Sequence, residues 1–181
     1  MRGISYTVSP LAERVVFDRN AGLANGFLYG GELGFGFGRY VELHALYLFN
    51  PDLRTDYSRL TGLDDAISGR LALLDGRRIG FRRYGGALKL NLLSGSTVPF
   101  LWLGTGLVRF TPDSLNTSRT IYLSAGAGVQ FTFDGRYALM VGVENVAYRY
   151  NLGAAFFGEG DLEAGGLAPA YFSQTQVNNW A

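Results

Sequence analysis

The sequence contains no cysteine, which excludes disulfide bonds, thiolate catalysis and iron–sulfur centres. It also lacks any run of about 18 consecutive apolar residues, so a transmembrane helix is excluded. Proline is limited to 5 residues and methionine to 2, and charged residues, at 17%, fall below the usual quarter. The formal net charge of +1 gives no electrostatic reason to expect a nucleic acid or another strongly charged partner.

The chain is instead rich in glycine, with 26 residues, and in aromatic residues, at 14%. This composition favours many β-strands and little helix. A length of 181 residues fits one domain, taken here as residues 1–181.

Residues 27–49 show the clearest pattern, because apolar residues alternate with small or charged ones in two runs around residues 38–40. A three-residue loop would place all the apolar side chains on one face of a hairpin. The other face is small and charged, and it carries Glu42 and His44, each opposite a glycine. Two interpretations follow. In a membrane strand the apolar face meets lipid, with aromatic residues at both interfaces. In a soluble sandwich or lipocalin-type barrel the same face would point inward.

The same alternation predicts further strands at residues 3–8, 79–93, 98–110, 120–133 and from 137 onward. Short turns are expected at 38–40, 94–97 and 134–136, and long connections at 9–25, 50–77, 111–119 and 151–176. Short turns on one side and long loops on the other are typical of outer-membrane barrels. Seven strands are visible, and VNNWA at 177–181 looks like the opening of an eighth, so truncation at one or both ends is expected.

The predicted fold class is therefore all-β, an eight-stranded antiparallel up-and-down transmembrane β-barrel with the eighth strand largely missing at the C-terminus. Its inward positions form a predicted charge network of Glu32, Glu42, His44, Arg83, Lys89 and Glu144. The lumen of such a barrel is just wide enough to be filled by side chains, and isolated buried charges are costly, so acids and bases should pair there. A packed, plugged lumen is predicted, with a narrow, porin-like channel for ions or small solutes as the alternative.

Catalysis is not expected. His44 is the only histidine, and the pattern directs it into the lumen without an evident serine nucleophile within reach, so a lipid-modifying enzyme is the weakest interpretation. No catalytic residue, cofactor or metal site is predicted, and the glycine-rich GELGFGFG lies inside a strand rather than before a helix. The aromatic residues at the strand ends are interpreted as two girdles, which are Phe27, Tyr29, Tyr47 and Phe49, and Phe35, Phe37, Phe131, Phe133 and Tyr137.

Three segments, VPFLWLGTGL, YLSAGAGVQFTFDGRYALMVGVENVAY and GGELGFGFGRYVELHALY, carry a resemblance to the OmpA-like, or opacity-type, family of small outer-membrane β-barrels. The resemblance covers most of residues 27–150. It implies an integral protein of a Gram-negative outer membrane, with periplasmic tight turns and long loops outside the cell. Outer-membrane lipid would be its first partner, and other envelope proteins would meet the loops.

The resemblance also implies that Glu32, Glu42, Arg83, Lys89 and Glu144 correspond to the interior pairs that are usual in such barrels. Two departures stand out. No peptidoglycan-binding domain follows the barrel, so an anchoring role is not carried over. A final strand ending in an aromatic residue is also missing after Ala181.

Overall fold

The computed structural model describes residues 4–18, 21–56, 58, 75–112, 118–134, 136–150 and 175–181. Within these residues the fold is all-β, without an α-helix. Eight strands are formed, which are β1 Ile4–Val15, β2 Gly26–Phe37, β3 Val41–Arg54, β4 Arg78–Asn91, β5 Thr97–Pro112, β6 Ser118–Phe133, β7 Tyr137–Tyr150 and β8 Thr175–Trp180.

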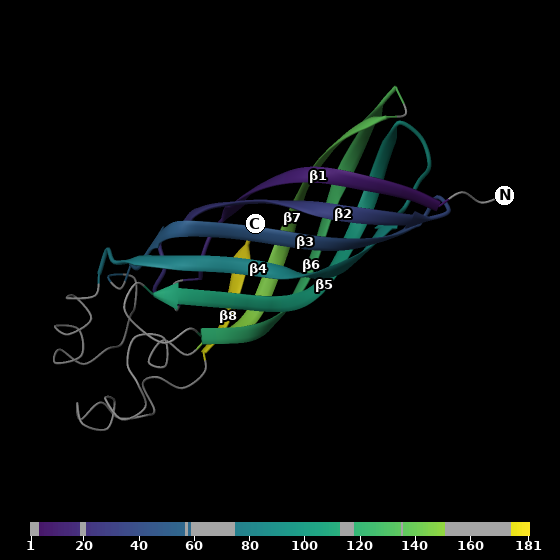
Figure 1. Cartoon of the computed structure of the whole chain (residues 1–181). Coiled ribbons are helices and arrows are strands. Elements are labelled where there is room, and N and C mark those ends of the chain that lie inside the picture. The colour runs from purple at the N-terminus through teal and green to yellow at the C-terminus, as the bar shows by residue number, and fades with distance from the viewer. Residues whose placement is uncertain are drawn as a thin grey trace.

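Each strand pairs antiparallel with the next, so the sheet order is β1 to β8 and the predicted up-and-down topology is confirmed. The sheet is strongly curled. Its curvature brings Arg83 of β4 into contact with Glu13 of β1 and Glu144 of β7 across the concave side. The molecule is elongated, and β1 begins at the same end as the tight turns (Figure 1). We call this the tight-turn end and the opposite end the long-connection end.

The curled sheet is not closed into a complete barrel. β8 has six residues, whereas β1 has 12 and β7 has 14. In the described residues, β8 pairs with the β1 side through one isolated antiparallel bridge, between Val16 and Trp180, and Asn179 Oδ1 accepts a hydrogen bond from the Asp18 N–H. The eighth strand is short, as predicted, and the predicted closure of the sheet into a barrel is not formed.

The two faces of the sheet differ sharply in polarity. Large apolar side chains cover the convex face and are exposed, for example Leu103 at 53%, Leu123 at 65% and Val141 at 59%. The concave face buries its side chains, including charged ones such as Lys89 and Arg83. The apolar face of the 27–49 hairpin therefore points outward, opposite to the orientation that the soluble interpretation required.

The register follows the predicted alternation. Residues Gly34 and His44 are opposite one another, and so are Lys89 and Trp102. Glycine is needed where two backbones come close, since a Cβ on Gly85 would lie 2.3 Å from the Thr105 carbonyl oxygen. These pairings fix which side chains face the interior.

The predicted loop at 9–25 is partly wrong, because β1 continues to Val15. The alternation runs on through Pro10 into Glu13, although residues 9–25 are polar and rich in turn-forming residues. Val16 exchanges backbone hydrogen bonds with Trp180, and the backbone groups of successive strand residues alternate in direction. The missing N–H of Pro10 consequently faces away from β2, where proline is tolerated.

The predicted connections at 50–77 and 111–119 are also shorter than expected at their ends. β3 extends to Arg54 through a register shift between Asn50 and Leu53, and β5 extends to Pro112. A bulge interrupts strict alternation, which is why the pattern after Asn50 resembled a loop. Residues 59–74, 113–117 and 151–174 lie outside the described part of the chain.

Candidate functional site

The interior of the sheet holds two groups of charged side chains. The first, the histidine cluster, consists of Glu32, Glu42, His44, Lys89 and Gln130. His44 Nδ1 lies 3.3 Å from Glu32 Oε2, and Nε2 lies 3.2 Å from Glu42 Oε2. Nε2 is hydrogen-bonded to Glu42, whereas the contact of Nδ1 with Glu32 is one of charge without a hydrogen bond. Carboxylates beside both ring nitrogens stabilise the protonated imidazole. The geometry therefore favours a positively charged histidine held between two acids.

Lys89 supplies the second positive charge of the histidine cluster. Its Nζ lies 3.3 Å from Glu42 Oε1 and donates a hydrogen bond to Gln130 Oε1. The side chain is fully buried and its ammonium sits 5.0 Å from the centre of the Phe100 ring. Two carboxylates and two cations thus balance, as a buried group of charges requires.

The second group, the arginine cluster, consists of Glu13, Arg83 and Glu144. Arg83 Nη1 donates to Glu13 Oε1 over 3.0 Å, and Nη2 donates to Glu144 Oε2 over 2.7 Å. The guanidinium also lies 5.4 Å from the centre of the Tyr122 ring. Three strands, β1, β4 and β7, are joined across the interior by this one side chain. The cluster holds two acids and one base, so its formal charge is −1 when both carboxyl groups are ionised.

An apolar cluster fills the interior toward the long-connection end. Its buried members include Leu28, Leu48, Phe81, Val108 and Phe110. Phe81 and Phe110 meet edge to face, with ring centres 5.2 Å apart. Buried aromatic and aliphatic side chains therefore occupy this part of the interior. We call it the apolar plug.

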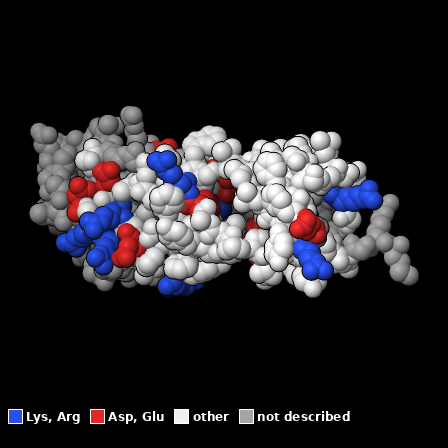
Figure 2. Space-filling view, turned by 90° about the horizontal axis from the view of Figure 1, so that it is seen from above, with Lys and Arg blue, Asp and Glu red and all other residues white. Residues whose placement is uncertain are grey.

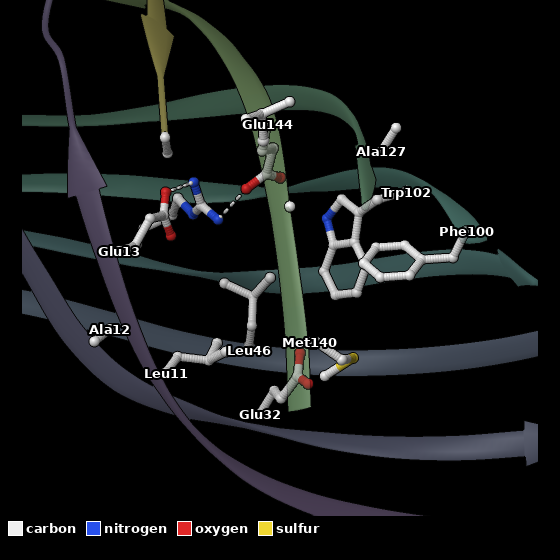
Figure 3. A pocket seen from close by; sticks show the side chains of 14 residues that line it. Leu11, Ala12, Glu13, Glu32, Leu46, Phe100, Trp102, Ala127, Met140 and Glu144 are labelled. Atoms are coloured by element: carbon white, nitrogen blue, oxygen red, sulfur yellow. Dashed lines mark hydrogen bonds and ion pairs between the residues drawn. The ribbon is translucent and has the colours of Figure 1, made fainter. Parts of the chain in front are cut away.

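A cavity of about 170 Å³ lies between the two charged clusters. Glu13, Glu32, Arg83 and Glu144 contribute its charged lining, and Trp102 is among its apolar walls (Figure 3). Figure 3 shows Glu13 and Glu144 approaching from opposite sides, with dashed lines to the guanidinium between them. The cavity also reaches residues of the convex face, such as Val143, so it extends through the wall.

The structure places all six residues of the predicted charge network on the concave face. It divides them, because Glu32, Glu42, His44 and Lys89 form one cluster while Arg83 and Glu144 belong to the other. Sequence reasoning missed Glu13, which was assigned to a loop. The available signal was the continued alternation of Ser9, Leu11 and Glu13 beyond Pro10.

The nine aromatic residues interpreted as girdles are all exposed on the convex face. One set lies toward the long-connection end, where Tyr29 pairs with Phe49 across β2 and β3. The other set lies toward the tight turns, where Phe133 pairs with Tyr137.

The chemistry of the interior is that of paired charges. The described residues contain no group of three or more potential metal-binding side chains. Carboxylates face both nitrogens of His44, so in the described residues no hydroxyl is seen paired with it as a nucleophile. None of the described segments is a helix long and apolar enough to cross a membrane. No family model, no curated protein and no solved structure matches the chain.

Proposed function

We propose that this chain is an integral outer-membrane β-barrel protein with a structural or surface-interaction role and a plugged lumen. The observation that carries the proposal is the reversed polarity of the sheet. Its convex face exposes large apolar side chains, while its charges are buried on the concave face. In water, an exposed apolar surface of this extent is a liability, whereas in a bilayer it is the lipid-facing surface.

The surface of the molecule supports this orientation. Figure 2 shows a largely white surface, with charged side chains at the two ends and in and beside a hollow between them. Strands of 12 to 16 residues in β1 to β7 are longer than the 9–11 residues that a tilted strand needs to span a bilayer. The aromatic residues near both ends of the convex face fit the two interfacial girdles of such proteins.

The plugged lumen is supported by the interior packing. The histidine cluster, the arginine cluster and the apolar plug occupy successive levels between the two ends of the sheet. An open water-filled pore would need a polar path through all three levels. The long connections beyond the strands are the proposed sites for contact with other envelope proteins.

Partitioning tests the membrane assignment most directly. We expect the purified chain to need detergent or lipid to give the circular dichroism of a folded β-sheet. In aqueous buffer alone it should aggregate or stay unfolded, because its convex face is apolar. A soluble, β-rich monomer without detergent would reject the proposal.

A narrow channel is the second candidate, and the charged cavity of about 170 Å³ is the observation in its favour. Single-channel recording of reconstituted protein separates the two functions. A plugged lumen gives no stable open events. Stable events that are abolished by Glu42→Gln or Lys89→Met would instead assign conduction through the histidine cluster. A lipid-modifying activity is tested by His44→Phe, which should leave the lipid A of expressing cells unchanged.

A further inference from the structure

Three arginines lie side by side on the convex face, near the long-connection end. Arg82 of β4 is directly opposite Arg109 of β5, and Arg109 is directly opposite Arg119 of β6. Arg82 and Arg119 are exposed, and Arg109 is half-buried. We call these three residues the arginine row. Because neighbouring strands are about 4.8 Å apart, the backbone positions of the three cations lie within about 10 Å of one another.

The arginine row has no acidic residue within its own strands. The sequences of β4, β5 and β6 contain neither aspartate nor glutamate. Arg78, by contrast, is paired with Asp52 of β3 over 3.4 Å. Among the described residues no ion pair neutralises the row, and the buried Nε of Arg109 has no hydrogen-bond partner there. Like charges directly opposite each other destabilise a sheet, so the row calls for an anion from outside these strands.

Apolar side chains adjoin the arginine row on the side toward the tight-turn end. The next outward positions of the same three strands are Tyr84, Leu107 and Ile121, which lie opposite one another in the same way. Ile121 is strongly exposed, and so is Leu123, the next outward residue of β6. A ligand bound here would meet cations at one end and an apolar surface at the other. That polarity matches an anionic lipid.

A groove of about 390 Å³ lies in the outer surface beside the arginine row. Arg82 forms part of its wall, together with the aromatic ring of Phe49. Two features open the groove, because β3 shifts its register between Asn50 and Leu53 and because Gly80 has no side chain. The groove gives a headgroup larger than a bare ion a place beside the guanidinium group of Arg82.

We propose that the arginine row binds the phosphate headgroup of a membrane lipid, whose acyl chains lie on the apolar side chains of β4 to β6. Guanidinium groups bind phosphate oxygens through pairs of parallel hydrogen bonds. A phosphate monoester carries close to two negative charges at neutral pH, so one headgroup neutralises most of the row. The site rests on the membrane function proposed above, because it needs a lipid against the convex face.

The probe is a fluorescent phosphatidic acid, and its matched partner is the diacylglycerol with the same acyl chains and no phosphate. Binding to the full chain, folded in a neutral detergent, is followed by fluorescence anisotropy. Phosphatidic acid should bind saturably and at least tenfold more tightly than diacylglycerol. Glycerol 3-phosphate, which has the phosphate without the chains, should compete at least a hundredfold more weakly than unlabelled phosphatidic acid. Equal competition would overturn the proposal, because the row would then bind free phosphate.

Charge-removing variants locate the binding site. Arg82→Gln, Arg109→Gln and Arg119→Gln should each weaken phosphatidic acid binding at least threefold, and the triple variant should lose the preference over diacylglycerol. Arg14→Gln is the matched control, because Arg14 is also exposed near the long-connection end but belongs to β1. It should bind within twofold of the original chain. Equal losses for the control and the row variants would indicate general attraction to a positive surface and would overturn the site.

Thermal unfolding gives a readout that a purely structural role of the row would not produce. In neutral detergent, Arg109→Gln should raise the midpoint of unfolding by about 1–4 °C, because it relieves repulsion from both neighbours. With phosphatidic acid added, the same variant should unfold at a lower temperature than the original chain, because it has lost a phosphate contact. A variant that is less stable than the original chain in both media would overturn the proposal.

The binding experiment also separates the lipid site from the membrane assignment. A chain that needs detergent to fold, but binds phosphatidic acid no more tightly than diacylglycerol, overturns the site and leaves the membrane assignment standing. A chain that folds as a soluble, β-rich monomer without detergent overturns the membrane assignment and the lipid site together. Detergent-dependent folding with a preference for phosphatidic acid that the triple variant loses supports both.

Discussion

Arg83 joins three strands, β1, β4 and β7, across the interior. It lies between Glu13 and Glu144, and it is 3% exposed. Removing one partner from a buried charge group leaves the others uncompensated, which costs about 3–5 kcal/mol. We therefore expect Arg83→Met to lower the free energy of unfolding by about that amount, measured by denaturant titration in detergent or lipid.

The control is Arg82→Met on the neighbouring, exposed position of β4, which should change stability by less than about 0.5 kcal/mol. Adding Glu13→Gln and Glu144→Gln to Arg83→Met should restore part of the loss, because the two carboxylates no longer repel. Equal effects of the Arg82 and Arg83 substitutions would show that the charge group does not hold the strands together.

The charged residues also show what a sequence can and cannot reveal. Glu42, His44 and Lys89 were predicted to face inward because strict alternation around a tight turn fixes the face of every side chain. The separation of Arg83 and Glu144 from these three residues was not predictable, since it depends on how the sheet curls. Glu13 was missed because residues 9–25 were interpreted as a polar, turn-rich loop. Pro10 does not end the strand, since its missing donor lies on the edge that does not pair with β2.

At the scale of the element, β4 and β5 approach closely where Gly85 pairs with Gly106. A Cβ on Gly85 would lie 2.3 Å from the Thr105 oxygen and 2.8 Å from the Gly106 Cα, so the two strands would have to move apart. Gly85→Ala should cost about 1–3 kcal/mol of stability in denaturant titrations. Gly86→Ala, whose Cβ has only a 3.5 Å contact, should be neutral or slightly stabilising. Similar losses at both positions would contradict the close approach.

The outer face of β6 offers a test of membrane depth along one strand. Leu123 lies within the strand and Phe133 at its tight-turn end, and both are exposed, at 65% and 55%. If the strand spans a bilayer, Leu123→Arg should cost about 2–4 kcal/mol and Phe133→Arg about 0–1 kcal/mol. The measurement is the free energy of unfolding in lipid vesicles. Equal costs at the two depths would count against a lipid-facing β6.

At the scale of the whole molecule, the topology was predictable and the closure was not. Short turns alternating with long connections specify neighbouring antiparallel strands, which gives the up-and-down order directly. Whether the last strand meets the first depends on residues more than 160 positions apart, about which local alternation carries no information. The position of β8 is therefore best tested by experiment.

The chain has no cysteine, so a pair introduced at Val16 and Trp180 can be oxidised without competing thiols. These residues exchange two backbone hydrogen bonds, which places their Cα atoms about 5.5 Å apart, within the range of a disulfide. We expect Val16→Cys with Trp180→Cys to cross-link efficiently when the folded chain is oxidised. Closing so long a loop should raise stability by up to about 5 kcal/mol in the chain-entropy model.

The control pair is Val8→Cys with Trp180→Cys. These positions lie farther apart, because Val8 is near the middle of β1, and they should not cross-link. Equal cross-linking of both pairs, or none for the first, would show that β8 does not end beside β1.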